Sequence, residues 1–70
     1  MKTVTFEKRN KDVSNVKDTI EYIAKTAQTK QDAVNRLSDV LPSTLKIGYG
    51  HNHVWCSGGD NIRLFIITGY

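Results

Sequence analysis

Polar and apolar residues alternate near the start of the chain, over residues 3–7. Val4 and Phe6 take the two apolar positions, and threonines and a glutamate take the others. Alternation with a period of two is typical of a strand with one buried face. We therefore expect a short N-terminal strand whose Val4 and Phe6 side chains point into the core.

Helical spacing follows the first charged loop, because apolar residues then recur at intervals of three and four. This spacing forms one apolar helix face and predicts a first helix over residues 13–27. Thr29 and Asp32 are spaced as in a capping box, which predicts that a second helix begins at Thr29 and stops before Pro42. The alternative is one long helix over residues 13–40, because the apolar pattern runs almost without interruption.

Alternation with a period of two returns after the proline. Three strands are expected over residues 45–49, 51–57 and 62–68, separated by glycine-rich turns. Gly48 and Gly50 are expected to bend the chain between strands or to permit a bulge. The element order is therefore β-α-(α)-β-β-β, with the last three strands forming an antiparallel meander.

The expected fold is a single α+β domain over residues 1–70, since a chain of this length forms one core. One or two helices pack on one face of a small, mostly antiparallel sheet. The expected core takes apolar residues from every element: Val4, Phe6, Val16, Ile20, Ile23, Ala27, Val34, Leu37, Leu41, Leu45, Ile47, Trp55, Leu64 and Ile66.

The last two predicted strands form a hairpin with two apolar faces. A turn centred on residues 59 and 60 pairs Cys56 with Arg63 and Val54 with Phe65. One face then carries Trp55, Ile62, Leu64 and Ile66, and the other carries Val54, Cys56, Arg63, Phe65 and Ile67. Because one helical layer covers only one face of a sheet, we expect the helices to cover the first face.

The second face is then the predicted protein-binding surface, formed by Val54, Arg63, Phe65 and Ile67. Phe65 would anchor a partner, and Arg63 is a cation favoured at interfaces. The partner would be a second copy of the chain, giving a two-fold dimer, or a host protein. The alternative is that a loop or terminal segment buries this strand on both sides.

The segment over residues 48–61 holds both histidines, the only cysteine, the only tryptophan and four of the five glycines. His51 and His53 have the spacing to share one strand face, but two ligands do not complete a zinc site. Cys56 has the opposite parity and no base of matching parity to activate it. We therefore expect no enzyme activity, no metal, no cofactor and no small-molecule substrate.

The net charge of +3, from ten basic and seven acidic residues, permits nucleic-acid binding without requiring it. The alternative function is therefore binding of RNA or single-stranded DNA by the sheet. Phe65 or Trp55 would stack on bases. The phosphates would be held by Lys8, Arg9, Lys11, Lys46 and Arg63.

No apolar stretch in the chain is long enough for a membrane helix, and none marks a signal peptide. The single cysteine has no partner within the chain and favours a reducing compartment such as the cytoplasm. The small size, the missing catalytic set and the Lys/Asn/Thr-rich composition are similar in type to small accessory proteins of bacteriophages. The leading hypothesis is a small non-catalytic protein-binding module that inhibits a host factor.

Overall fold

The computed structural model describes residues 2–7 and 11–70 of the chain. In chain order it contains β1 (Thr3–Phe6), a 3₁₀ helix η1 (Lys11–Val16), α1 (Lys17–Thr26), α2 (Lys30–Val40), β2 (Lys46–Tyr49), β3 (His53–Ser57) and β4 (Arg63–Thr68). The predicted α+β class and the order of strands and helices are confirmed. None of the helices in the described part of the chain is long and apolar enough to cross a membrane.

Two separate helices form, as the capping pattern predicted, and the single long helix does not. The backbone becomes extended at Ala27 and stays extended at Thr29, so the chain turns between α1 and α2. The Thr29 hydroxyl then accepts a hydrogen bond of 3.1 Å from the backbone N–H of Asp32. This bond satisfies one of the free donors at the start of α2 and marks the helix boundary.

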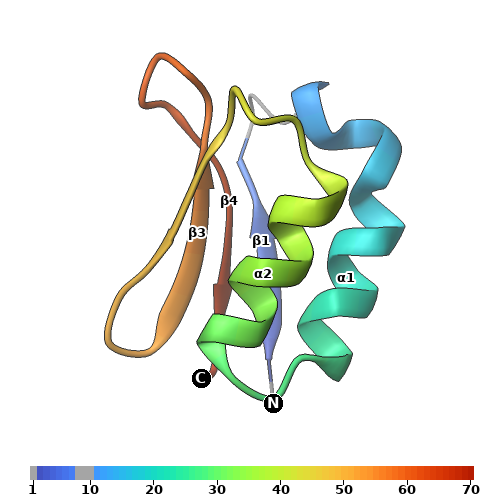
Figure 1. Cartoon of the computed structure of the whole chain (residues 1–70), viewed down its shortest axis with the longest axis vertical. Helices are drawn as coiled ribbons and strands as arrows, with labels where there is room; N and C mark the ends of the chain where they lie inside the picture. Colours follow the sequence, from blue (N-terminus) through green and yellow to red (C-terminus); the bar gives the residue numbers. More distant parts are fainter. Residues whose placement is uncertain (1, 8–10) are drawn as a thin grey trace.

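The four strands form one antiparallel sheet in the order β1-β4-β3-β2. The N-terminal strand therefore pairs with the C-terminal strand and extends the predicted meander by one strand. Both helices lie on one side of this sheet, and neither lies on the other (Figure 1). The sheet thus has one covered face, toward the helices, and one open face.

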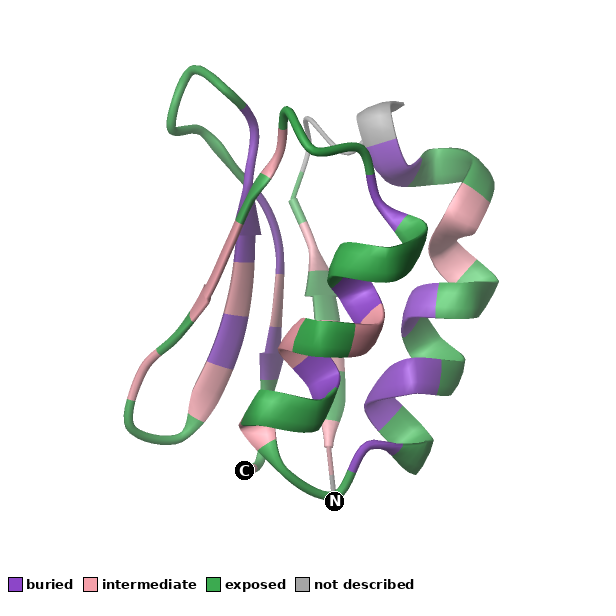
Figure 2. Cartoon of the chain, in the orientation of Figure 1, coloured by how far each residue is buried: buried purple, intermediate pink, exposed green. Residues whose placement is uncertain are grey.

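The helices turn their apolar sides toward the covered face (Figure 2). Ile20, Ile23 and Ala24 of α1 are buried, as are Ala33 and Leu37 of α2. The buried apolar residues of the described chain form one cluster: Val13, Ile20, Ile23, Ala24, Ala27, Ala33, Leu37, Leu41, Val54, Cys56, Leu64, Phe65 and Ile67. Of the predicted core residues, Val4, Phe6, Val16, Val34, Leu45 and Ile47 are partly buried against that cluster.

The predicted register of the last hairpin is wrong. Cys56 lies opposite Phe65 instead of Arg63, and Val54 lies opposite Ile67 instead of Phe65. The turn is longer than predicted, because the N–H of Gly58 donates to the Ile62 carbonyl at 2.9 Å. The register also shifts between Cys56 and Ser57, where β4 contains one extra residue.

The prediction of which face the helices cover is also wrong. Val54, Phe65 and Ile67, expected in water, are each 0% exposed. Trp55 and Ile66, expected in the core, are half-buried on the open face. The two edge strands explain the outcome, because they add apolar residues to the covered face: Val4 lies opposite Ile67, Phe6 opposite Phe65 and Ile47 opposite Cys56.

Candidate binding face of the sheet

The open face is built from the strand residues that alternate with the buried ones. Its central row crosses all four strands: Gly48 lies opposite Trp55, Trp55 opposite Ile66, and Ile66 opposite Thr5. Trp55 and Ile66 are its two large apolar side chains in this row, and both remain partly exposed. The described helices leave this row uncovered (Figure 1).

The indole of Trp55 lies across the backbone of β2 at Gly48. A Cβ atom on Gly48 would stand 2.5 Å from Cζ2 and 2.8 Å from Cε2 of the ring. Real Cβ atoms essentially never come this close to another atom, so the indole occupies space that only a glycine leaves free. The indole therefore packs against the strand at Gly48, and the side chain stays partly exposed on the open face.

The imidazole of His53 rests on Gly50 in the same manner. A Cβ atom on Gly50 would collide with Cε1 of the ring and stand 2.7 Å from Nε2. The N–H of Gly50 donates to the His53 carbonyl at 2.9 Å, which holds the two backbones together. His53 and Trp55 are two residues apart on β3, so their rings lie side by side above β2.

Gly50 lies where the chain turns from β2 to β3, as predicted, but Gly48 forms neither a bend nor a bulge. β2 pairs with β3 in an unbroken register from Lys46 to Tyr49, with no bulge at Gly48. Both glycines also leave room for a ring of β3, which the sequence pattern did not predict. The alternation of β2 and β3 was visible in the sequence, but not that Gly48 lies opposite Trp55. Recognising this required the register of the β2–β3 pair.

A lysine and an arginine lie one row beyond Trp55. Lys46 on β2 and Arg63 on β4 are both opposite Ser57 of β3, and both are exposed. The Lys46 ammonium donates to the Asn61 side-chain oxygen at 2.7 Å. Asn61 has a positive φ of 66°, a conformation that asparagine tolerates in turns. The turn thus positions the lysine at this end of the sheet.

The structure brings together only part of the predicted nucleic-acid site. Lys46 and Arg63 flank the same residue of β3. Lys8 and Arg9 lie outside the described residues, and Lys11 begins η1 without a described side chain. Phe65, one of the two stacking candidates, is core, so Trp55 is the stacking residue that remains on the open face.

The predicted protein-binding surface is not a surface of the folded chain. Val54, Phe65 and Ile67 lie between the sheet and the helices, and only Arg63 of the four residues is exposed. A partner could contact the three apolar residues only after the helices moved away. These residues are buried because the helices cover the face of the sheet that was expected to be open.

The two histidines and the cysteine of this segment do not lie together, because the sheet stands between His53 and Cys56. Cys56 is buried on the covered face, and burial raises the pKa of its thiol to about 11. His53 lies on the open face, and His51 is exposed in the β2–β3 loop. Among residues 2–7 and 11–70, no three His, Cys, Asp or Glu residues gather where they could hold a metal ion.

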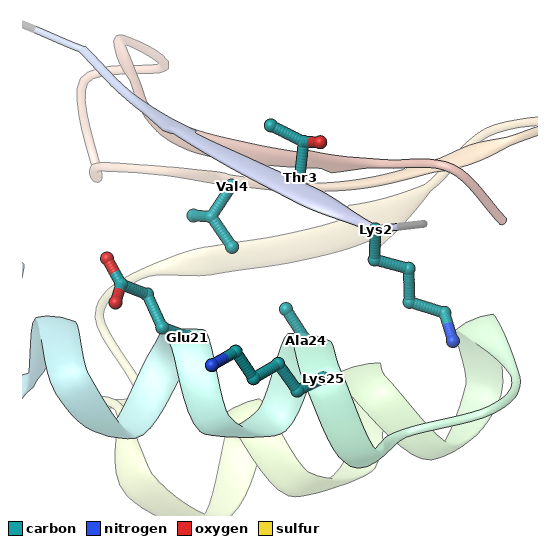
Figure 3. Close-up of a pocket in the computed structure, with 6 residues that line it drawn as sticks. All are labelled: Lys2, Thr3, Val4, Glu21, Ala24 and Lys25. Atoms are coloured by element: carbon teal, nitrogen blue, oxygen red, sulfur yellow. The ribbon is translucent and has the colours of Figure 1, made fainter.

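A small hollow lies between β1 and α1, away from the open face (Figure 3). Its volume is about 230 Å³, and it is lined by Lys2, Thr3, Val4, Glu21, Ala24 and Lys25. Val4 and Ala24 face each other across the gap, and charged side chains of both signs stand around them. Its lining contains no aromatic side chain, whereas the open face carries Trp55 and His53, so the open face is the stronger candidate site.

No protein-family model matches this chain, and no curated protein or solved structure is significantly similar to it. The assignment of function therefore rests on the geometry of the open face.

Proposed function

We propose that this domain is a non-catalytic binding module and that its open sheet face binds single-stranded nucleic acid. The observation that carries the proposal is the position of Trp55, whose partly exposed indole packs against Gly48 on the open face. A base can stack on the exposed part of the ring, because the described helices lie on the other side of the sheet (Figure 1). Stacking of this kind contributes about 1–3 kcal/mol per base and tolerates every base type.

The charges next to Trp55 favour a nucleic-acid strand over a neutral ligand. Lys46 and Arg63 stand in the adjacent row, where they can contact the phosphate groups beside a stacked base. The chain carries a net charge of +3, so its overall field also attracts a polyanion. Glu7, directly after β1, is exposed at the far edge of the sheet from Lys46.

A protein partner is the second candidate, and the pair of Trp55 and Ile66 is the observation that favours it. Tryptophan and arginine are the residues most enriched at interface hot spots, and Arg63 lies on the strand that carries Ile66. Such a partner would be a second copy of the chain or a host protein that a phage-type accessory protein inhibits. The buried, unpaired thiol of Cys56 suits a reducing compartment such as the cytoplasm for either function.

The test is a fluorescence titration with short oligo(dT) and oligo(rU), because Trp55 is the only tryptophan in the chain. We expect quenching at low salt and an affinity that falls with salt, with a log–log slope of roughly −0.7 for each phosphate contact. The Trp55→Ala variant, followed by calorimetry, should bind about 5- to 150-fold more weakly.

Tyr22→Ala is the matched control, because Tyr22 is an aromatic residue 61% exposed on α1, away from the open face. It should bind as the wild type does. Absence of any binding by the wild type at low salt would contradict the nucleic-acid proposal. If sedimentation then showed a dimer that Trp55→Ala dissociates, the protein-partner candidate would replace it.

A further inference from the structure

We propose that the two ring–glycine pairs are two adjacent base sites, so that a bound strand runs along β3 with one base on Trp55 and the next on His53. This inference rests on the proposed function and specifies the ligand that the open face accepts. Its basis is that His53 lies over Gly50 as Trp55 lies over Gly48. One ring on the open face would bind a single base, whereas two rings along β3 define the line along which a bound strand runs.

The distance between the two rings selects for unstacked bases. Residues two apart on a strand are separated by about 6.8 Å, which is twice the 3.4 Å rise between stacked bases in one strand of a duplex. Two neighbouring bases that stay stacked on each other cannot both lie on the rings. Each base must instead leave its neighbour and stack on its own ring. The site therefore favours single strands over duplexes.

The second base site is held in place by the helical layer. The Lys30 ammonium of α2 donates to the carbonyls of Gly50 and His51, at 2.7 Å each. The same ammonium lies 5.4 Å from the centre of the Tyr49 ring. These contacts fix the backbone on which the His53 ring rests. A binding surface that is already ordered loses less entropy when a ligand binds.

The remaining open-face positions limit the length of the bound strand. His53 is the first residue of β3, and its cross-strand neighbours, Thr68 of β4 and Thr3 of β1, offer hydroxyl groups and no rings. Beyond Trp55, Lys46 and Arg63 flank Ser57 and provide the phosphate contacts. The sites along β3 are therefore one base on His53, one base on Trp55 and the phosphate that follows. Affinity should stop rising at about two to three nucleotides.

The experiment compares a mononucleotide, a dinucleotide and a tetranucleotide of thymidine by calorimetry, using Gly50→Ala as the variant. The added methyl group collides with the His53 ring and displaces it, while the ring itself remains in the protein. Gly59→Ala is the matched control, because its Cβ would meet only the Thr44 carbonyl oxygen, at an ordinary 3.7 Å. Thermal unfolding of both variants checks that the fold is retained.

For the wild type and Gly59→Ala, we expect the dinucleotide to bind about 5- to 150-fold more tightly than the mononucleotide, which is the effect of one stacked base. For Gly50→Ala, this gain should disappear while mononucleotide binding on Trp55 remains. Because Gly50→Ala introduces a steric clash, His53→Ala and His53→Phe form a second pair. His53→Ala should also lose the gain, and His53→Phe should retain it.

The outcomes separate this inference from the proposed function. If the wild type binds the tetranucleotide but Gly50→Ala and His53→Ala keep the full dinucleotide gain, the second base site is refuted and a single site on Trp55 remains. If the wild type binds none of the three ligands at low salt, the proposed function and this inference both fail. An affinity for a hairpin duplex equal to that for a single strand of the same length would also overturn the inference.

Discussion

The two faces of the sheet are made from alternate residues of the same four strands, yet they differ sharply in chemistry. On β3 and β4, the covered face presents Val54, Cys56, Phe65 and Ile67, all fully buried. The open face presents Trp55 and Ile66 between two glycines on one side and threonines on the other. Both faces of the central hairpin are apolar, so the hairpin does not itself determine which one the helices cover.

The edge strands decide between the two faces. β1 and β2 add Val4, Phe6 and Ile47 to the covered face. To the open face the same strands add Thr3, Thr5, Lys46 and Gly48. A helix that buries apolar surface gains free energy in proportion to the area removed from water. The helices therefore cover the face on which all four strands contribute apolar side chains.

The largest effect that this comparison predicts is on stability. Phe65→Ala should destabilise the domain by about 3–5 kcal/mol, because it empties a fully buried position next to Phe6. A domain of this size has a total stability of roughly 4–10 kcal/mol, so this variant should be unfolded or close to it. Urea unfolding followed by far-UV circular dichroism measures the loss.

Trp55→Ala is the matched substitution on the other face of the sheet. It removes a larger side chain that is only half-buried, so it should cost clearly less than Phe65→Ala. If Trp55→Ala were the more damaging of the two, the assignment of the covered and open faces would be wrong.

The choice of face was the part of the fold that sequence patterns could not settle. The α+β class and the order of elements follow from local periodicity, and the helix boundary follows from one capping residue, Thr29. Burial of Phe65 depends instead on β1, which lies next to β4 although 56 residues separate Phe6 from Arg63 in the chain. Non-local pairing of this kind leaves no local signal in the sequence.

The second prediction concerns the pKa of Cys56, whose side chain is fully buried on the covered face. Burial raises the pKa of the thiol from 9.0 to about 11. Well below pH 9 the thiol is neutral in both the folded and the unfolded chain, so the folded state loses no stability through its ionisation. Between pH 9 and 11 the unfolded chain loses its thiol proton while the folded chain keeps it, so stability falls as the pH rises.

The expected loss over this window is roughly 2–3 kcal/mol, since each pKa unit corresponds to 1.36 kcal/mol. Burial also raises the pKa of Tyr70, which adds a loss of the same sign at high pH. Urea unfolding at pH 8, 9, 10 and 11 measures the total. Cys56→Ala should show a flatter pH dependence than the wild type, and equal slopes for both proteins would contradict a buried thiol.

The candidate site was harder to predict than the fold, because its residues meet only through the pairing of β2 with β3. Gly48 and Gly50 are visible in the sequence as turn-type residues, and Trp55 as a large apolar one. Only the pairing of Gly48 with Trp55 shows that the glycine makes room for the indole. Lys46 and Arg63 were predicted as phosphate contacts, but their position on either side of Ser57 required the sheet order.

The smallest predicted effect concerns these two cations at the end of the open face. Lys46→Ala and Arg63→Ala remove exposed side chains, so each should change the free energy of unfolding by less than about 0.5 kcal/mol. In oligonucleotide binding, each should reduce the steepness of the log–log salt dependence by roughly 0.7, the value for one lost contact to a single strand. Titrations at four salt concentrations measure the slope.

Lys25→Ala is the control for the two cation variants, because it removes the same charge from the exposed side of α1, beside the hollow between that helix and β1. It lowers the net charge by one but should leave the salt slope unchanged, since Lys25 lies on the helical side of the sheet. A change of slope equal to that of Lys46→Ala would mean that the net charge alone attracts the strand. Phosphate contacts would then be no more specific to the open face than to the helical side of the sheet.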